Sequence, residues 1–211
     1  ILAEDGVSLL PYDSIYEYVK EFEKDTKVLL CKRKANSRLV SSISSDVTIL
    51  DEENLTFLPK AIKNPTEVEN ERIAHIKDGV AVTKFIYWLK KNVGKIPITE
   101  MSAADKLYSL RSEQQNFIDN SFDPIISYGV HAAINHYFAT PETDIPIEPR
   151  SFVLADTGGN YYEGTTDITR TVVMGPVTEE QKMYFTAVLR GMLNLGAAKF
   201  RYGCTGVNLD Y

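Results

Sequence analysis

The sequence predicts a chain of mixed α and β structure in two parts, and the prediction rests on two patterns, one in each part. Over residues 1–58, short apolar strands alternate with short helical patterns, which is typical of an α/β domain. Over residues 59–211, two amphipathic helices come first, a group of strands follows, and a long helix comes last, which is typical of an α+β domain. The first part is too small to close a layered core alone, so we expect it to be the tail of a larger α/β domain.

The composition is that of a globular protein, because the 211 residues are 44% hydrophobic and 25% charged. Lysine and arginine number 23 against 29 aspartates and glutamates, and the net charge of −6 disfavours binding to nucleic acid or to an anionic membrane. No apolar stretch approaches the about 18–20 residues that cross a bilayer. Cys31 and Cys204 are too few for a disulfide framework, and no secretory signal is visible. We therefore expect a cytoplasmic protein whose partners include neither nucleic acid nor membrane.

Apolar spacing predicts four short elements in the first part. Helical spacing follows a capping position at Asp13 or Ser14, and β-branched runs mark the strands. The predicted elements are a helix over 15–22, a strand over 28–30, a helical turn over 39–43 and a strand over 47–50.

A long helix opens the second part. Asn64 can cap it, Pro65 suits the first helical position because its missing N–H costs nothing there, and Glu67 can reach back to the cap. Apolar residues keep a spacing of three to four over 68–93, and Gly94 predicts the end of the helix.

The remaining elements follow from capping and turn signals. A second helix is predicted to start at the capping box 102–105, and a last helix at the capping box 178–181, ending near Gly203. Between them, apolar and β-branched runs alternate with turn residues. The predicted strands cover 124–128, 132–137, 151–155 and 165–174.

Two aspartates in the strand-rich region are the candidates for chemistry. Asp156 follows the apolar run 152–155, so its carboxylate lies at the end of a buried strand. Gly158 and Gly159 permit a tight reversal, and the return strand carries Asp167. A hairpin of this length can bring both carboxylates to one face of a sheet.

Paired carboxylates need something to offset their repulsion, which is about 4 kcal/mol at about 4 Å and an effective dielectric of about 20. A shared proton, an arginine or a metal can do so, and hard divalent cations prefer oxygen ligands. The alternative is structural: Asp156 starts a turn, and Asp167 pairs with Arg170 or caps the local threonines. The spacing alone leaves both interpretations open.

Three other features have simpler interpretations. His131 is interpreted as a surface residue at the start of a strand, in preference to a second polar group near the cleft. Arg170 is interpreted as a structural partner for nearby carboxylates. Trp88, with Phe85 and Tyr87 on the long helix, is interpreted as packing in the core or at an interface.

The segment DTGGNYYEGTTDITRT at 156–171 resembles the metal-binding signature of the creatinase and aminopeptidase P family, the pita-bread metallopeptidases. In that family two aspartate ligands are separated by this same step of eleven residues. Further stretches resemble the family in the same order, and those on the first two helices favour the multi-domain aminopeptidase P over prolidase. These stretches are 74–81, 102–107, 121–122 and 129–137.

The resemblance implies the fold and the extent of the chain. Residues 59–211 would be the first half of a pita-bread catalytic domain, and residues 1–58 would be the tail of the non-catalytic α/β domain of creatinase type that precedes it. The sequence opens within an apolar run and closes on what resembles the start of a new element, so we expect a fragment of a longer protein. Its uncovered apolar face is expected to make the fragment self-associate, which light scattering would detect.

The resemblance also implies roles for three residues. Asp156 and Asp167 would be metal ligands, with Asp167 near both of two divalent ions, expected to be Mn²⁺. His136 would be the family histidine that contacts substrate and assists proton transfer. Its structural alternative is a strand histidine bonded to a neighbouring group.

The implied activity is that of an Xaa-Pro aminopeptidase, a metal-dependent hydrolase that releases the N-terminal residue from peptides with proline at the second position. Divalent ions lower the pKa of a bound water and stabilise the developing oxyanion when that water attacks the carbonyl before the proline. The partner would be a peptide with an Xaa-Pro N-terminus, and the full-length protein is expected to be a homodimer. Two alternatives stay open: a prolidase-type dipeptidase, and a metal-free pita-bread module that binds peptides or proteins.

The family needs three more ligands, one histidine and two glutamates, and all of them lie downstream of the hairpin. Glu179 and Glu180 open the last helix and are interpreted as capping and dipole residues. We therefore expect this chain alone to bind metal weakly and to be inactive. The histidines of the chain, all of which precede the hairpin, are His75, His131 and His136.

Overall fold

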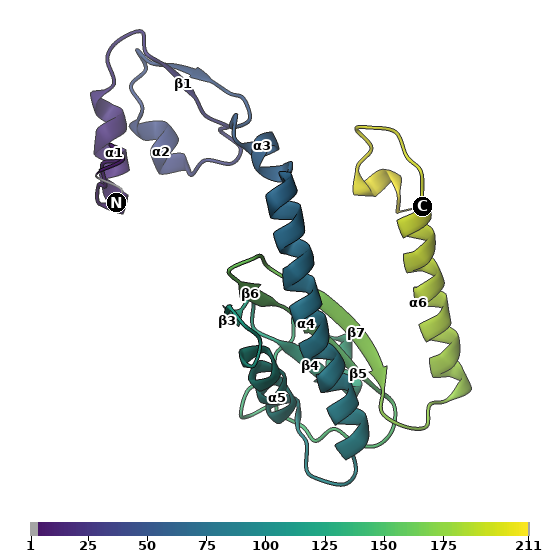
Figure 1. Ribbon diagram of the computed structural model, residues 1–211. Coiled ribbons are helices and arrows are strands. Elements are labelled where there is room, and N and C mark those ends of the chain that lie inside the picture. Colours follow the sequence, from purple (N-terminus) through teal and green to yellow (C-terminus); the bar gives the residue numbers. More distant parts are fainter. Residues whose placement is uncertain (1–3, 211) are drawn as a thin grey trace. The chain divides into compact units, whose positions relative to one another are not determined.

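The structure, a computed structural model, describes residues 4–210 and divides into two compact units, Ile1–Asn64 and Pro65–Tyr211 (Figure 1). Each unit mixes helices and strands, as the sequence predicts. The division falls directly before the long helix, whereas the predicted domain boundary at 58/59 lies a few residues earlier. As a statement about domains, that boundary stays a prediction.

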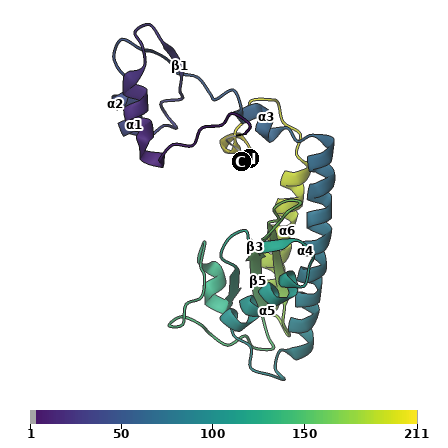
Figure 2. The same cartoon turned by 60° about the vertical axis from the view of Figure 1, so that its left-hand side comes forward.

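The first unit contains a pair of parallel strands joined through a helix. In β1 and β2, Val28 lies opposite Ile49, and parallel pairing of this kind is the arrangement expected of an α/β domain. The helices α1 and α2 pack on each other (Figure 2). The elements are η1 (Tyr12–Ser14), α1 (Ile15–Tyr18), η2 (Val19–Glu21), β1 (Lys27–Leu29), α2 (Ser37–Ser42), β2 (Thr48–Leu50) and α3 (Phe57–Ala61).

The second unit begins with the predicted long helix and ends with the predicted last one. Its elements are α4 (Pro65–Asn92), α5 (Glu100–Ser112), β3 (Phe117–Asn120), β4 (Ile125–Tyr128), η3 (Gly129–Ala133), β5 (Phe152–Thr157), β6 (Gly159–Tyr161), β7 (Ile168–Val173), α6 (Glu179–Ala197) and η4 (Gly206–Asn208).

Helix α4 starts and stops where the sequence predicts. Pro65 is its first residue, and Gly94, two residues after its end, has a φ of +75°, a conformation that glycine adopts without strain. One face of the helix is buried, and the residues on it are Ala74, Asp78, Ala81, Val82, Phe85 and Leu89.

Helix α5 begins earlier than predicted. The capping box pairs Thr99 with Ser102: the Ser102 N–H donates to Thr99 Oγ1 at 3.2 Å, and the Thr99 N–H donates to Ser102 Oγ at 2.8 Å. The predicted start at Ser102 is therefore wrong, because Ser102 closes the box from within the first turn and is not the cap.

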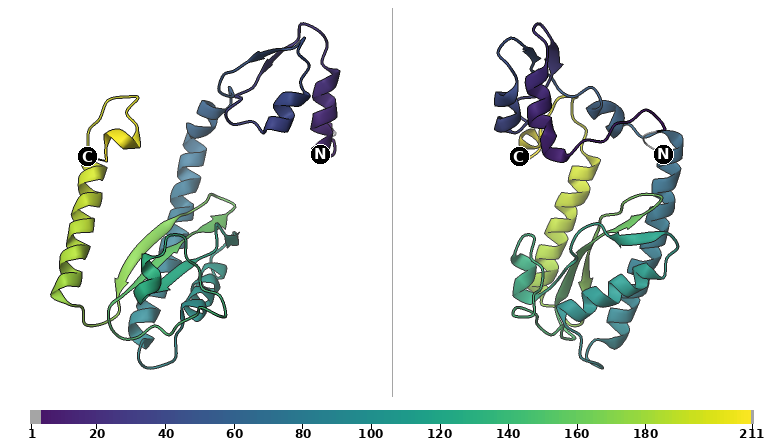
Figure 3. Two further views of the ribbon diagram at one scale, coloured as in Figure 1. Left: turned by 180° about the vertical axis from the view of Figure 1, so that it is seen from behind. Right: turned by 90° about the vertical axis from the view of Figure 1, so that its left-hand side faces the viewer.

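The central sheet is antiparallel, three-stranded and ordered β4-β5-β7, and β3 and β6 form a separate two-stranded ladder. Helix α4 runs along one face of the three-stranded sheet (Figure 3). Side chains of β5 alternate between the two faces, so Val153 and Ala155 are buried against the helices, whereas Leu154 and Asp156 face the other side. The core cluster is contributed by α4, α5 and the sheet, and includes Phe85, Leu89, Leu107, Ile126, Val153 and Val172.

The predicted strand over 132–137 is wrong. The chain turns out of β4 at Gly129, whose φ is +58°, forms the short helix η3, and turns again at His136, whose φ is +57°. The hydroxyl of Tyr137 then donates to the buried carboxylate of Glu100 at 3.0 Å. This tertiary hydrogen bond fixes the end of the segment at a position that a strand over 132–137 would not give it.

The predicted reversal at Gly158 and Gly159 is also wrong, because the chain continues there into β6. The turn lies between Tyr161 and Gly164, whose N–H groups donate to each other's carbonyl oxygens at 2.9 and 3.1 Å. The two glycines instead permit close packing: a Cβ at Gly158 would overlap the carbonyl oxygen of Thr166 and the hydroxyl of Ser121.

Replacing Gly158 by alanine is expected to destabilise the second unit by about 1–3 kcal/mol, since the added methyl group has no room. The matched control is Gly191→Ala in α6, where the Cβ meets open space and helix propensity predicts a gain of up to about 1 kcal/mol. Urea unfolding of both variants measures the difference. Equal free energies of unfolding would contradict the close packing at Gly158.

Helix α6 begins at the predicted capping box, in which the Gln181 N–H donates to Thr178 Oγ1 at 3.1 Å. It ends at Ala197, earlier than the predicted end near Gly203. Phe185 stacks on Phe152 of β5 with ring centroids 5.6 Å apart, but much of the helix's apolar surface is exposed. Within residues 4–210, no helix has the length and apolarity that crossing a bilayer requires.

Candidate metal and substrate site

The three residues predicted to carry the chemistry line one cavity. Asp156 lies near the end of β5, Asp167 directly precedes β7, and His136 comes from the loop after η3. The cavity has a volume of about 420 Å³. Its other lining residues are Phe122, Asp123, Ile125 and Phe138.

Asp156 is half-buried and held within the ladder. It lies opposite Ile125 of β4 and Thr169 of β7, and its Oδ1 accepts a hydrogen bond from Thr169 Oγ1 at 2.8 Å. The structural alternative, in which Asp156 starts a turn, is therefore wrong, because the residue is paired on both sides inside a strand. A threonine hydroxyl leaves the carboxylate able to bind a cation, since it donates to one lone pair only.

Asp167 and His136 are both exposed at this cavity. Arg170 donates from Nη1 to the carbonyl oxygen of Thr169 at 2.7 Å, so its described hydrogen bond goes to the backbone and not to a carboxylate as predicted. His136 lies in a loop, so the alternative of a strand histidine is wrong, while its part in proton transfer stays a prediction.

A buried ion pair that the sequence reading missed lies directly behind these aspartates. Asp78 of α4 and Arg111 of α5 are both fully buried, and Arg111 donates from Nε to Asp78 Oδ1 at 2.7 Å and from Nη2 to Oδ2 at 3.1 Å. The same Nη2 donates to Thr157 Oγ1 at 2.9 Å. Thr166 Oγ1 donates to Asp78 Oδ2 at 2.7 Å, and the Tyr161 hydroxyl donates to Oδ1 at 3.1 Å.

We call these five residues, Asp78, Arg111, Thr157, Tyr161 and Thr166, the Asp78 network. Its carboxylate accepts four hydrogen bonds, which is what a buried charge needs to offset its lost hydration. Burial, together with the nearby Asp78 carboxylate, raises the pKa of the Tyr161 hydroxyl, so that this group stays a donor. Arg111 Nη1 is the one buried atom of its guanidinium without a partner among the described residues.

The sequence does carry a signal for this network. Asp78 stands at helical spacing from Ala74 and Val82, on the apolar face of α4, and Arg111 stands in the same way after Leu107 on α5. Charges on apolar faces predict a buried pair. Only the packing of α4 against α5 identifies the partners.

A second ion pair holds the turn of the hairpin. Glu163, which stands in the signature between the two aspartates, accepts from Lys77 Nζ at 2.6 Å and from Asn116 Nδ2 at 2.8 Å. These donors hold the pKa of the Glu163 carboxyl below its usual value. The turn is thereby fastened to α4 and to the residue before β3.

Stability of the second unit is expected to fall in acid partly through Glu163. Its pKa is lower in the folded than in the unfolded state, so the charged carboxylate stabilises the fold above about pH 4.5, and that contribution is lost as the pH falls through the lower folded value. The variant Glu163→Gln should show a shallower loss of thermal stability below this pH. Adding Lys77→Met to Glu163→Gln should leave the pH dependence of thermal stability unchanged. An unaltered slope in Glu163→Gln would contradict the assignment.

His131 is half-buried and paired, so its interpretation as a surface residue at the start of a strand is wrong. Its Nδ1 lies 3.0 Å from Glu100 Oε2, and Glu100 Oε1 accepts from the Tyr128 N–H at 2.7 Å. Glu100 is fully buried at the start of α5, where it fastens the loop that carries His136. The predicted packing role of Trp88 is confirmed, since its ring stacks on buried Phe85.

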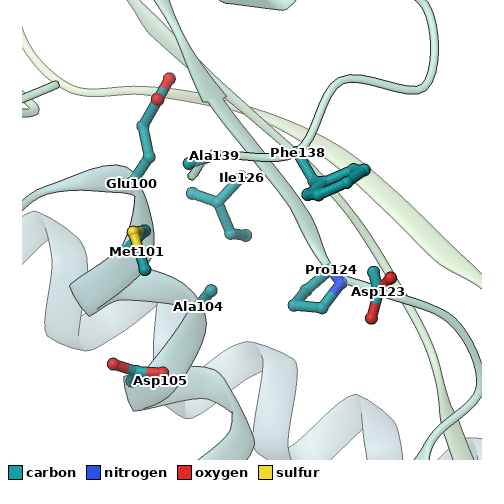
Figure 4. Close-up of a pocket in the computed structure, with 9 residues that line it drawn as sticks. All are labelled: Glu100, Met101, Ala104, Asp105, Asp123, Pro124, Ile126, Phe138 and Ala139. Carbon is teal, nitrogen blue, oxygen red and sulfur yellow. The ribbon is translucent and has the colours of Figure 1, made fainter. Parts of the chain in front are cut away.

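A smaller cavity of about 250 Å³ adjoins the first, and Asp123 and Phe138 line both. Figure 4 shows Glu100 and Met101 at the start of α5 on one side of it and Asp123 and Phe138 on another. The lining of this smaller cavity therefore combines apolar side chains with the carboxylates of Glu100, Asp105 and Asp123.

The donors fit a divalent cation in kind, because two carboxylates at one cavity offer the hard oxygen ligands that Mg²⁺ or Mn²⁺ prefers. Among residues 4–210, no group of three or more histidine, cysteine, aspartate or glutamate side chains could hold a metal ion. Within the described residues, these two aspartates do not by themselves complete a metal site.

Comparison with known proteins bears out the fold. Residues 69–211 match the family model described as metallopeptidase family M24, and residues 1–67 match the one described as the creatinase/prolidase N-terminal domain. A protein from Paracoccidioides brasiliensis (strain Pb03), named probable Xaa-Pro aminopeptidase P, is 37% identical over 220 residues, which are 98% of this chain and 36% of that protein. One of the same name from Botryotinia fuckeliana is 37% identical over 218 residues, 99% of this chain and 33% of that protein.

Solved structures agree. An X-prolyl aminopeptidase from Caenorhabditis elegans, described as a cytosolic enzyme with a di-nuclear active site, matches with a TM-score of 0.86 and 31% identity over 99% of this chain and 35% of its own. A prolidase from Pyrococcus furiosus shares the fold, with a TM-score of 0.66 and 24% identity over 90% of this chain and 53% of its own.

The chain spans 36% or less of the length of the two relatives named above. The predicted fold, a pita-bread domain preceded by the tail of a creatinase-type domain, is confirmed by both family models. Since the first of them accounts for residues 69–211, well over half of the sequence, the chain belongs to metallopeptidase family M24.

Proposed function

We propose that this chain is part of a metal-dependent Xaa-Pro aminopeptidase, which releases the N-terminal residue from peptides that carry proline at the second position. The observation that carries the proposal is the meeting of Asp156, Asp167 and His136 at one cavity. The names of the relatives at 37% identity support the substrate class, and the di-nuclear site of the Caenorhabditis elegans protein supports a pair of metal ions.

Asp156 and Asp167 would hold two divalent ions, expected to be Mn²⁺, with Asp167 near both. When bound, such ions supply Lewis-acid chemistry: they polarise the scissile carbonyl and lower the pKa of the attacking water. Thr169 orients Asp156 through its hydroxyl. His136, exposed at the same cavity, would contact the substrate and carry a proton between it and the solvent.

The rest of the ligand set would come from chain beyond these residues. Two carboxylates are fewer donors than a pair of divalent ions needs, and the relatives are about three times as long as this chain. We therefore propose that the 211 residues alone bind metal weakly and do not turn over peptide. The complete protein would act as a homodimer in the cytoplasm.

The first test is the intact mass of the purified protein, followed by a Mn²⁺-dependent assay on an Xaa-Pro-Xaa peptide. We expect proline-specific release by a protein larger than 23.7 kDa, and no release by the chain of 23.7 kDa. The matched control peptide is Xaa-Ala-Xaa.

Other outcomes separate the alternatives. Cleavage of free Xaa-Pro dipeptides in preference to longer peptides would indicate a prolidase-type enzyme. A larger protein that binds no metal and cleaves neither class would indicate a binding module and would overturn the proposal.

A further inference from the structure

We propose that the Asp78 network fixes the positions of both metal-ligand candidates, Asp156 and Asp167. It does so through the hydroxyls of Thr157 and Thr166, the residues next to these two aspartates. This inference rests on the proposed function, because it takes the two aspartates to be ligands. Asp78 and Arg111 are thereby positioning residues, which act through the threonines without touching the metal or the substrate.

The sequence order makes the two threonines suited to this role. Thr157 directly follows Asp156, and Thr166 directly precedes Asp167. Consecutive side chains of an extended chain point to opposite sides, so a threonine fixed on the core side turns the neighbouring aspartate toward the other side. The burial agrees: Thr157 is 1% exposed and Thr166 is fully buried, whereas Asp156 is half-buried and Asp167 is exposed.

A single carboxylate, that of Asp78, is linked both to the end of β5 and to the segment that precedes β7. Asp78 accepts directly from Thr166 at 2.7 Å and holds Arg111, which in turn donates to Thr157 at 2.9 Å. These hydrogen bonds therefore connect two packed helices, α4 and α5, to the segment that carries Asp156 and to the segment that carries Asp167.

Thr166 is fixed at every polar atom. Its Oγ1 also accepts from the Gly159 N–H at 2.9 Å, its N–H donates to the Gly159 carbonyl oxygen at 2.9 Å, and its own carbonyl oxygen accepts from Ser121 Oγ at 2.9 Å. A residue held this completely cannot rotate without breaking several buried hydrogen bonds. Asp167, next to it, makes no side-chain hydrogen bond to another described residue, so its direction depends on Thr166.

A metal site needs this kind of support, because ligands must be held to within about 0.5 Å of their working geometry. Loss of a partner that orients a ligand typically lowers metal affinity by about 10- to 100-fold. If the network only stabilised the fold, breaking it would lower metal affinity no more than any other substitution that lowers the free energy of unfolding by the same amount.

The test compares substitutions of equal shape in the intact protein. Thr166→Val removes the hydroxyl and keeps the volume, and Thr166→Ser keeps the hydroxyl. Thr165→Val makes the same change one residue away, where the exposed hydroxyl donates to Asn160 Oδ1 at 2.8 Å. The readouts are the dissociation constant for Mn²⁺ alone, by calorimetry, and the thermal midpoint without metal. We expect Thr166→Val to weaken Mn²⁺ binding by about 10- to 100-fold, and Thr166→Ser and Thr165→Val to stay near the parent protein.

The variant Asp167→Asn shows whether a negative result refutes this inference alone or the proposed function as well. If Asp167→Asn keeps the Mn²⁺ affinity, the ligand assignment fails and the positioning role fails with it. If Asp167→Asn loses the affinity but Thr166→Val binds Mn²⁺ like Thr165→Val, the positioning role alone is overturned. Should Thr166→Val not fold, Thr157→Val against Thr157→Ser makes the same comparison through the other hydroxyl.

Discussion

Replacing Asp167 by asparagine in the intact protein is expected to reduce Mn²⁺-dependent release of the N-terminal residue to background. An amide carries no charge and offers one oxygen in place of two, so a ligand proposed to lie near both ions is lost. The loss of Mn²⁺ affinity should exceed about 100-fold, the upper end of what loss of an orienting partner costs. Peptide assays and calorimetry measure the two effects.

The fold should survive this substitution, because Asp167 is exposed and the buried hydrogen bonds at this point belong to Thr166. The matched control is Asp119→Asn in β3, an equally exposed carboxylate that bonds to the N–H of the next residue. It makes the same change of charge and should leave activity near that of the parent. Retained activity in Asp167→Asn, or equal loss in both variants, would refute the assignment of Asp167.

Replacing Arg111 by methionine is expected to destabilise the second unit by about 3–5 kcal/mol. The change removes two of the four hydrogen bonds to Asp78 and leaves its carboxylate fully buried without its cationic partner. Thr157 loses its donor at the same time. Urea unfolding gives the free energy directly.

The control is an exposed ion pair between the same two regions. Lys84 of α4 lies 3.0 Å from Glu113, at the end of α5, and both side chains are 50% exposed. Lys84→Met should cost at most about 1 kcal/mol, because solvent screens such pairs. If Arg111→Met costs no more than Lys84→Met, the Asp78 network does not contribute to stability as its burial implies. The double variant Asp78→Asn/Arg111→Met should cost less than the sum of its parts, since it leaves no unpaired charge.

Sequence reading succeeded where the determining interactions are local. The start of α4 at Pro65, its end before Gly94 and the capping box at Thr178 follow from backbone hydrogen bonds within one turn of helix. The prediction is wrong over 132–137, where the apolar run suggests a strand but His131 and Tyr137 bond to Glu100 and the chain takes another path. A contact with a residue about thirty positions away leaves no trace in local spacing.

The sequence likewise predicted only part of the candidate site. The spacing of Asp156 and Asp167, strengthened by a family resemblance, predicted that both carboxylates could lie on one face of a sheet, and the structure places both at one cavity. The predicted position of the turn that joins their segments is wrong, because Gly158 packs closely against Thr166 and Gly159 against the rings of Tyr161 and Phe117, and neither forms the reversal. Sequence alone could not distinguish these uses, since both need the absence of a Cβ.

By itself, then, the sequence predicted the family, the two-part organisation, both ends of α4 and the start of α6, because short-range periodicity and motif order encode them. It also singled out Asp156 and Asp167, which the structure places at one cavity. Only the tertiary structure shows the buried ion pair that lies next to these two aspartates. Asp78 and Arg111 are 33 residues apart, and each looks locally like a misplaced charge on an apolar helix face. Their burial is tolerable only once α4 packs on α5 and the threonines of the hairpin complete the hydrogen bonds, a condition that no local pattern contains.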